Sequence, residues 1–392
     1  MPQCAIMSAV DSILSYLRGR HPEIVDLIRR FVEAESPSGD AAAVSRFVDL
    51  VADTLAPMAD VRTLPAGNFG KHLVAEMKLP GRKPRGRILV LGHADTVWPI
   101  GTLGSMPFRE SGGRLWGPGV LDMKAGIAFF VFAVQALRDL DIAVGSKVVL
   151  QVNADEEVGS PTSRPLTEKN ARRSQAVLVL EPGTGLEGKL KTARKGVGEY
   201  TIVVRGRPAH AGLDFTAGAS AILELARQVG VIAGFTRLER GVTVNPGVIS
   251  GGTRPNVVAA EARVEVDIRV PRLKDAAALD KKFRKLRPRD RRCSIEVSGG
   301  LNRLPMERSA GGIRLFRAAR RIARGLDMDL GESFSGGGSD GNFTAALGIP
   351  TLDGLGAVGE GAHAPHESIL VDPIAGRTAL IARLLAGTYN EC

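Results

Sequence analysis

Residues 88–95 read Ile-Leu-Val-Leu-Gly-His-Ala-Asp, an apolar run that ends in two polar side chains. The run has the length and the branched apolar residues of a strand that is buried on both faces. Two further runs of this kind lie at 147–153 and 176–180, and helical patterns at 124–140 and 161–173 lie between the three runs. Strands that alternate with helices predict an α/β fold, with a mostly parallel sheet sandwiched by helices.

The pattern changes near residue 196. Segments 199–205 and 263–270 alternate apolar and polar residues with a period of two, which is typical of antiparallel strands with one solvent-exposed face. Segment 217–231 between them has a helical pattern, and another buried run follows at 348–352. We therefore expect a first domain that is interrupted by a smaller α+β domain. The expected division is 1–195 and 311–392 for the first domain and 196–310 for the insertion.

The overall composition is that of a folded globular protein. The 392 residues are too many for one ordinary core, which favours two domains. Hydrophobic residues make up 44% and charged residues 24%, values that do not indicate disorder. The longest apolar candidate, 126–137, is shorter than the roughly 18 residues of a membrane span. It therefore predicts a buried helix, and we expect no membrane partner.

The first residues and the cysteines bear on location in the cell. The chain starts with Met-Pro-Gln-Cys, without the basic and apolar segments of a signal peptide. Cys4, Cys293 and Cys392 are far apart and lack metal-site spacing, so reduced thiols are the simplest interpretation. We therefore expect a cytoplasmic protein.

The formal net charge is +10, and much of the excess lies in residues 281–292, KKFRKLRPRDRR. Such a run indicates either a nucleic-acid patch or the solvated end of a helix that Pro288 terminates. Phe283 is the one aromatic residue in the run, and no nucleic-acid-binding motif accompanies it. The solvated helix end is therefore the favoured interpretation, with no nucleic-acid partner. A positive field would still attract an anionic substrate.

Polar side chains follow the predicted strand of residues 88–92. His93 comes directly after it, and Asp95 lies two positions on. Residues i and i+2 of an extended segment share a side, so Asp95 is placed to orient the imidazole of His93. The alternative is one surface histidine and one aspartate that caps a helix.

Two acidic segments continue the series. Asp122 lies in a Gly-rich turn, 117–126, that leads into a helix; its two oxygens suit a bridge between two metal ions, or it caps that helix. Glu156 and Glu157 follow the run 147–153, and adjacent carboxylates repel one another unless a cation or a proton lies between them. One would then bind metal while the other takes a proton from water. The alternative is a solvated acidic turn.

The last candidates are Glu181, which ends a strand, and two histidines in a late Gly-rich loop, His363 and His366. Imidazole and carboxylate groups are ligands for a zinc-like metal, and the whole set is large enough for two ions. The series therefore predicts a two-metal hydrolase.

Taken together, the motifs resemble the glutamate carboxypeptidase, acetylornithine deacetylase and succinyl-diaminopimelate desuccinylase family of dizinc metallopeptidases, and within it the glutamate carboxypeptidases. The resemblance runs from about residue 20 to the end of the chain. The segments that carry it are GHADTV (92–97), GPGVLDMKAG (117–126), NADEEVGS (153–160), EPG (181–183), GRPAHAG (206–212), GGGSDG (336–341) and GAHAPHE (361–367).

The resemblance implies a role for each polar residue. The expected ligands of two zinc ions, with cobalt or manganese as substitutes, are His93, Asp122, Glu157, Glu181 and His363. Asp122 would bridge the two ions, Glu156 would be the general base, and Asp95 would orient His93. The family pattern places a glutamate a few residues after the last ligand, which favours His363 with Glu367 and leaves His366 as the competing ligand.

The resemblance also implies roles for the insertion. In the family it usually mediates dimerisation, and its fold is expected to be ferredoxin-like with an antiparallel sheet. His210 would stabilise an oxyanion in the active site of the partner subunit. The positions that match substrate-contacting residues are Lys189, Asn256, Arg269 and Arg303. Lys191 stands where the family has a small polar residue, which weakens a strict preference for glutamate.

We therefore expect a zinc-dependent amide or peptide hydrolase that releases a C-terminal amino acid, glutamate or another acidic residue, from an N-acyl or peptidyl substrate. A homodimer is the expected assembly. An N-acyl amino acid deacylase or a carbamoylase of the same family is the nearest alternative. A non-catalytic binding protein is the alternative from another class, although no expected ligand or base is missing from the sequence.

Overall fold

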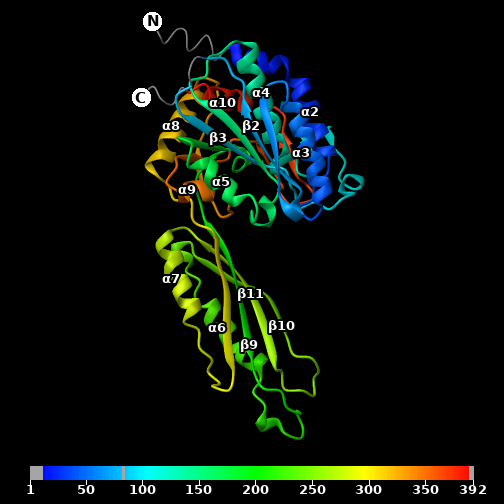
Figure 1. Cartoon of the computed structure of the whole chain (residues 1–392), viewed down its shortest axis with the longest axis vertical. Coiled ribbons are helices and arrows are strands. Elements are labelled where there is room, and N and C mark those ends of the chain that lie inside the picture. The colour runs from blue at the N-terminus through cyan, green and yellow to red at the C-terminus, as the bar shows by residue number, and fades with distance from the viewer. Residues whose placement is uncertain (1–11, 82–83, 388–392) are drawn as a thin grey trace. The chain divides into compact units, whose positions relative to one another are not determined.

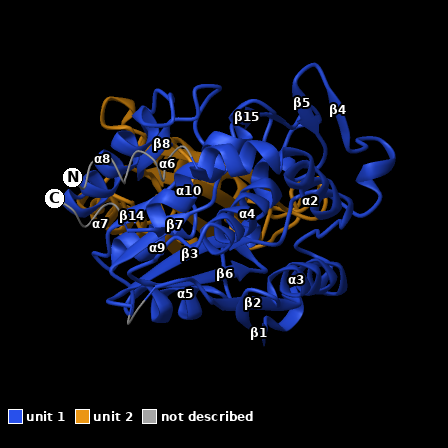
Figure 2. Cartoon of the chain, turned by 90° about the horizontal axis from the view of Figure 1, so that it is seen from above, with its two compact units in different colours: residues 1–193, 308–335, 339–392 blue, residues 194–307, 336–338 orange. Residues whose placement is uncertain are grey.

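The computed structural model describes residues 12–81 and 84–387, and it divides into two compact units (Figure 2). Unit 1 comprises 1–193, 308–335 and 339–392, and unit 2 comprises 194–307 and 336–338. The long segment of unit 2 begins at residue 194, two residues before the predicted start at 196. It ends at residue 307, three residues before the predicted end at 310. The grouping of Gly336–Gly338 with unit 2 had no counterpart in the sequence pattern.

Unit 1 is built on a six-stranded mixed sheet with the order β1-β2-β6-β3-β7-β14. Strands β6, β3, β7 and β14 run parallel to one another, whereas β2 pairs antiparallel with both β6 and the edge strand β1. The strands span Ala59–Pro65 (β1), Lys71–Met77 (β2), Lys147–Asn153 (β6), Arg87–His93 (β3), Ala176–Val179 (β7) and Thr351–Leu352 (β14). The parallel part of the sheet agrees with the sequence pattern.

Helices cover both faces of this sheet (Figure 1). In β3, Ile88 and Val90 point into the larger core, and Leu89 and Leu91 point into the smaller one. This alternation explains why the strand is apolar throughout. The larger core is lined by α2 (His21–Glu33), α3 (Ala41–Leu55), α4 (Ala125–Asp139), α8 (Ala310–Arg324) and α10 (Pro373–Leu385); α5 (Arg164–Ala171) and α9 (Gly341–Ala346) lie on the other face.

Helix α4 is the central helix of unit 1 and packs between α2 and α10. Among the described residues, Val120–Asp139 is the one helical stretch long and apolar enough to cross a membrane, and 89% of its 18-residue apolar window is buried inside the structure. A helix that is apolar on all sides is expected in such a core position. The predicted buried helix at 126–137 lies within it.

Two small sheets complete unit 1. One pairs β15 and β16 with β5 and β4, in that order, and the other pairs β13 with β8. Their strands span Arg109–Ser111 (β4), Arg114–Trp116 (β5), Leu190–Arg194 (β8), Glu332–Ser335 (β13), Gly359–Glu360 (β15) and Ser368–Leu370 (β16). The first of these sheets holds the late Gly-rich loop, residues 361–367, between β15 and β16.

Unit 2 is a βαββαβ unit with a four-stranded antiparallel sheet of order β10-β11-β9-β12, which is the ferredoxin-like arrangement. The elements are β9 (Gly196–Arg205), α6 (Ala221–Ala233), β10 (Thr243–Gly251), β11 (Glu261–Val270), α7 (Leu273–Arg284) and β12 (Ser294–Arg303). Alternate residues of β9 and β11, such as Ile202 and Val264, form its core. The predicted period of two reflects this one-sided burial.

Candidate metal centre

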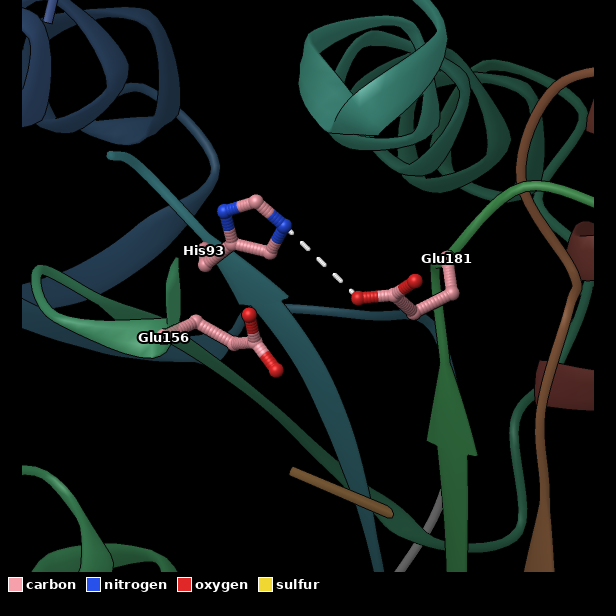
Figure 3. Close-up of side chains that lie close together, drawn as sticks. All are labelled: His93, Glu156 and Glu181. Atoms are coloured by element: carbon pink, nitrogen blue, oxygen red, sulfur yellow. Dashed lines mark ion pairs between the residues drawn. The ribbon is translucent and has the colours of Figure 1, made fainter. Parts of the chain in front are cut away.

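The carboxyl ends of three adjacent parallel strands bring polar side chains together (Figure 3). His93 is the last residue of β3, Glu156 lies three residues beyond β6, and Glu181 lies two residues beyond β7. The side chains of all three point into a common space, and ligand atoms of this trio lie within 4.8 Å of one another. The crevice beyond the carboxyl ends of parallel strands is the usual ligand site of an open α/β sheet.

Asp122 lies between two histidines. Its Oδ1 is 3.2 Å from His93 Nε2, and its Oδ2 is 3.4 Å from His363 Nε2. The same Nε2 atom of each ring also faces a second carboxylate, with His93 Nε2 3.6 Å from Glu181 Oε1 and His363 Nε2 3.2 Å from Glu157 Oε1. The five predicted ligands therefore form two sets that share one carboxylate.

These separations suit a small dication. Zinc ligands at about 2.0–2.2 Å in a tetrahedral arrangement lie roughly 3.3–3.6 Å from one another, and the four imidazole–carboxylate separations are 3.2 to 3.6 Å. His93 Nδ1 donates to the carbonyl oxygen of Asp95 at 2.9 Å. The neutral ring then has its lone pair on Nε2, the atom that faces Asp122 and Glu181.

The electrostatics of the cluster also favour a cation. Burial alone would lower the pKa of His93, but hydrogen bonds to Asp122 and Asp95 outweigh it and raise that pKa. Hydrogen bonds to Asp122 and Glu157 raise the pKa of His363 to about 10. Burial would raise the pKa of Asp122, and its bonds to both histidines reverse that shift. The negative field that holds protons on the two rings would equally stabilise a bound dication.

The carboxylate of Asp95 does more than face His93. It is 3.5 Å from His93 Nδ1, and its two oxygens accept the backbone N–H groups of Glu156 and Glu157, each at 3.1 Å. Ser38 Oγ also donates to Asp95, at 2.8 Å. The predicted orienting contact is thus supplied mainly by the Asp95 carbonyl oxygen, and the carboxylate holds the turn that carries the two glutamates.

The two histidines of the late Gly-rich loop, His363 and His366, differ in what their rings contact. Both histidines are exposed, and the structure places the ring of His363 against Asp122 and Glu157. His363 has a positive φ of 62°, a backbone conformation that is uncommon for residues other than glycine. The geometry therefore favours His363 as the ligand in this loop.

The predicted substrate residues of unit 2 lie at two ends of its sheet. Arg269 on β11 and Arg303 on β12 both pair with Val197, near the start of β9. His210 follows the other end of β9, where Ala211 N donates to the carbonyl oxygen of Asn256 at 3.0 Å. The eight residue steps from Val197 to Arg205 span about 27 Å of strand. One copy of unit 2 therefore does not gather all four residues at one small ligand.

The two lysines at the predicted substrate position differ in exposure. The side chain of Lys189 is 43% exposed, and its ammonium group is 3.7 Å from Glu187 Oε2. Lys191 is buried, and its backbone pairs with that of Asp353. The residue that departs from the family pattern is thus the one enclosed within unit 1.

Comparison with known proteins identifies the family of the chain. The model of the peptidase family M20/M25/M40 matches residues 89–387. This chain belongs to that family. It is 27% identical to carboxypeptidase G2 of Pseudomonas sp. (strain RS-16) over 372 residues, which cover 93% of this chain and 89% of that protein.

Solved structures of peptidases share the fold. Aminopeptidase PepT from Bacillus cereus is 21% identical with a TM-score of 0.76, and the match covers 94% of this chain and 98% of that one. The YXEP protein of Bacillus subtilis, a dinuclear metal binding peptidase from M20 family, is 14% identical with a TM-score of 0.70, covering 96% and 100%. The α/β architecture of this M20 chain is therefore that of a known peptidase family.

Two buried charged residues of this M20 chain have contacts that the sequence pattern did not predict, although Glu367 was already named beside His363. Glu367 is fully buried and accepts hydrogen bonds from the turn that carries Asp122. Lys124 is 1% exposed; its ammonium group donates to the Ala34 carbonyl oxygen at 2.6 Å, and burial lowers its pKa to about 7. Both charges lie inside the motifs that carry the candidate metal ligands, and this position was the sequence signal that could have identified them.

Proposed function

We propose that the protein is a zinc-dependent amide or peptide hydrolase that releases a C-terminal amino acid, preferably an acidic one, from N-acyl or peptidyl substrates. The observation that carries this proposal is the position of Asp122 between His93 and His363, with Glu156 beside the first histidine. In this arrangement the carboxylate of Asp122 is shared by the two ligand sets, and the carboxylate of Glu156 belongs to neither set.

His93, Asp122 and Glu181 would hold one zinc ion, and His363, Asp122 and Glu157 the second, with cobalt or manganese as substitutes. When bound, such ions polarise an amide carbonyl and lower the pKa of water toward neutrality. The donor set of imidazole and carboxylate groups is the set that zinc accepts.

Glu156 would move the proton during hydrolysis. Its carboxylate lies close to His93 and Glu181, so it would reach a water molecule bound at the first ligand set. It would take a proton from that water and pass it to the leaving amine. Asp95 holds the backbone of Glu156 and Glu157, so it would fix where these two carboxylates stand.

His210 is suited to stabilise the oxyanion. Its Nδ1 accepts the backbone N–H groups of Gly212 and Leu213, both at 3.1 Å. The neutral ring then carries its proton on Nε2, which makes that atom a hydrogen-bond donor. A donor held in this way would meet developing negative charge without reorganising.

Basic residues support an acidic leaving group. Lys189, Asn256, Arg269 and Arg303 are the proposed substrate contacts, and arginine binds a carboxylate through two parallel hydrogen bonds. Unit 2 carries 21 lysines and arginines against 12 acidic residues, so it accounts for +9 of the +10 net charge. The positive field of such a unit attracts anionic substrates.

A homodimer would complete the site. His210 and Arg269 lie at opposite ends of the unit 2 sheet, so the two would meet one substrate when each comes from a different copy. Unit 2 also has apolar side chains in solvent: Leu213 is 86%, Phe215 61% and Ile249 62% exposed. Strand β10, which bears Ile249, is an unpaired edge of the sheet. Exposed apolar side chains and an open edge are typical of an interaction surface.

The proposal is tested by measuring metal content together with amino-acid release from a panel of N-acyl and dipeptide substrates. We expect about two zinc ions per chain, with the fastest release from substrates that end in glutamate or aspartate. Release of apolar amino acids alone would instead favour a deacylase, and release from N-carbamoyl substrates a carbamoylase. Bound metal without any hydrolysis across the panel would favour a non-catalytic binding protein.

A further inference from the structure

Glu367 is a buried carboxylate whose two oxygens each accept two N–H groups. Oε1 accepts from Leu121 N at 2.8 Å and from Asp122 N at 3.1 Å. Oε2 accepts from Gly119 N at 3.0 Å and from Trp98 Nε1 at 2.7 Å. All four partners are N–H donors, so the group they fit is an ionised carboxylate.

These bonds join three separate segments of unit 1. Trp98 belongs to the segment that follows β3, while Gly119, Leu121 and Asp122 form the turn before α4. Glu367 itself ends the loop that carries His363. One carboxylate therefore sets the distance between the turn that bears the shared aspartate and the loop that bears the last histidine.

We propose that Glu367 is a positioning residue that holds Asp122 between His93 and His363, so that both metal ions bind. Its bond to the Asp122 backbone N–H leaves the Asp122 side chain with both oxygens directed at the two histidines. This inference rests on the proposed metal role of Asp122. It adds a residue that would touch neither metal nor substrate.

The four N–H donors around Glu367 require a hydrogen-bond acceptor at both oxygen positions of its side chain. A glutamine at this position has nearly the same shape, but its NH₂ group would face two N–H donors whichever way the amide turns. Glu367→Gln would therefore lose two hydrogen bonds and set donor against donor, so Asp122 would lose its fixed position. Trp98→Phe removes one donor and leaves the three backbone bonds intact.

Glu224 in unit 2 provides a matched control. It is fully buried, and its oxygens also accept four N–H groups: from Gln228 Nε2 at 2.7 Å, Arg289 N at 3.0 Å, Asp290 N at 3.1 Å and Arg227 at 3.2 Å. Glu224→Gln makes the same chemical change in unit 2, which holds none of the proposed metal ligands.

The test is zinc titration of the wild type, E367Q, W98F and E224Q by calorimetry, with thermal unfolding of each metal-free protein. We expect E367Q to bind zinc about 10- to 100-fold more weakly, W98F to bind about threefold more weakly, and E224Q to bind as the wild type does. Zinc affinity of E367Q equal to that of E224Q would overturn the inference.

Two further outcomes are decisive. If E367Q does not fold, W98F decides, and an unchanged zinc affinity in folded W98F contradicts the positioning role. If the wild type itself binds no zinc, the proposed function fails and this inference fails with it. Tight zinc binding by both the wild type and E367Q refutes the inference alone.

Discussion

A methyl group on Gly126 would lie 2.3 Å from the carbonyl oxygen of Leu180. Helix α4 thus meets the end of β7 at a distance that only glycine permits, directly before Glu181. We predict that Gly126→Ala lowers the free energy of unfolding by about 1–3 kcal/mol, as overpacking does. Gly230 in α6 has no neighbour within 4 Å of such a methyl group, so Gly230→Ala should raise stability by about 0.5–1 kcal/mol. Urea unfolding of both variants measures the two effects, and equal shifts would refute the close approach.

Glu156→Gln should lower kcat by about 10²- to 10⁴-fold, because it removes the group that accepts the proton. Zinc content should stay at the wild-type value, since the five proposed ligands are unchanged. Glu157→Gln should instead weaken binding of the second ion, because Glu157 lies against His363. Rates and metal content of the two variants separate these roles. Hydrolysis by E156Q near the wild-type rate would exclude Glu156 as the base.

Metal binding should release protons near neutral pH. The pKa of His363 in the metal-free protein is about 10, so its ring is protonated at pH 7–8 and must lose that proton before it binds metal. The apparent zinc affinity should therefore rise as the pH rises. Calorimetry in buffers of different ionisation enthalpy counts the protons, and His363→Gln should release fewer of them. An equal count in both proteins would exclude this linkage.

Mixing two inactive variants should restore activity. In a symmetric dimer, a site that takes His210 from one chain and Arg269 from the other survives once in each mixed dimer of H210A and R269A. Random exchange would then recover about a quarter of the wild-type activity. The measurement is kcat after mixing and refolding, with each variant alone as the control. Mixtures no more active than the separate variants would place both residues in one chain's site.

The proposed dimer surface makes a further prediction. Ile249→Lys puts a charge on an apolar side chain that is 62% exposed on the edge strand β10, so it should not disturb the core of unit 2. We expect it to shift the protein from dimer to monomer in light scattering and to lower activity in parallel. Glu296→Lys, an exposed change on the opposite edge strand β12, serves as the control. A wild type that is monomeric at all concentrations would refute the assembly.

The parts of the site at strand ends could be predicted from sequence, and the reason is local. A buried strand such as 87–93 is visible as an apolar run, and the residue that follows it must lie at the edge of the sheet. The hairpin of β1 and β2 was not predicted, because most of β1 is exposed and its residues show no clear apolar period.

Contacts between distant segments were beyond the sequence pattern. Glu367 and Asp122 are 245 positions apart, and no spacing rule joins them. The same holds for Asp95, whose carboxylate meets the backbone of Glu156 and Glu157 and not only the imidazole of its neighbour. Side chains that bind backbone atoms leave no recognisable sequence pattern, because the backbone atoms that they bind are the same in every residue.

The discontinuity of unit 1 has a consequence for synthesis on the ribosome. Apart from three glycines, unit 2 is one continuous segment, so it can fold as soon as residues 194–307 have emerged. Unit 1 has to wait, since α10 packs on α4 and His363 and Glu367 come late in translation. Until then Asp122 and Glu157 lack the imidazole that faces them both. The nascent chain therefore carries a complete unit 2 before the site in unit 1 is assembled, and zinc binding by both ligand sets would have to follow the emergence of residues 361–367.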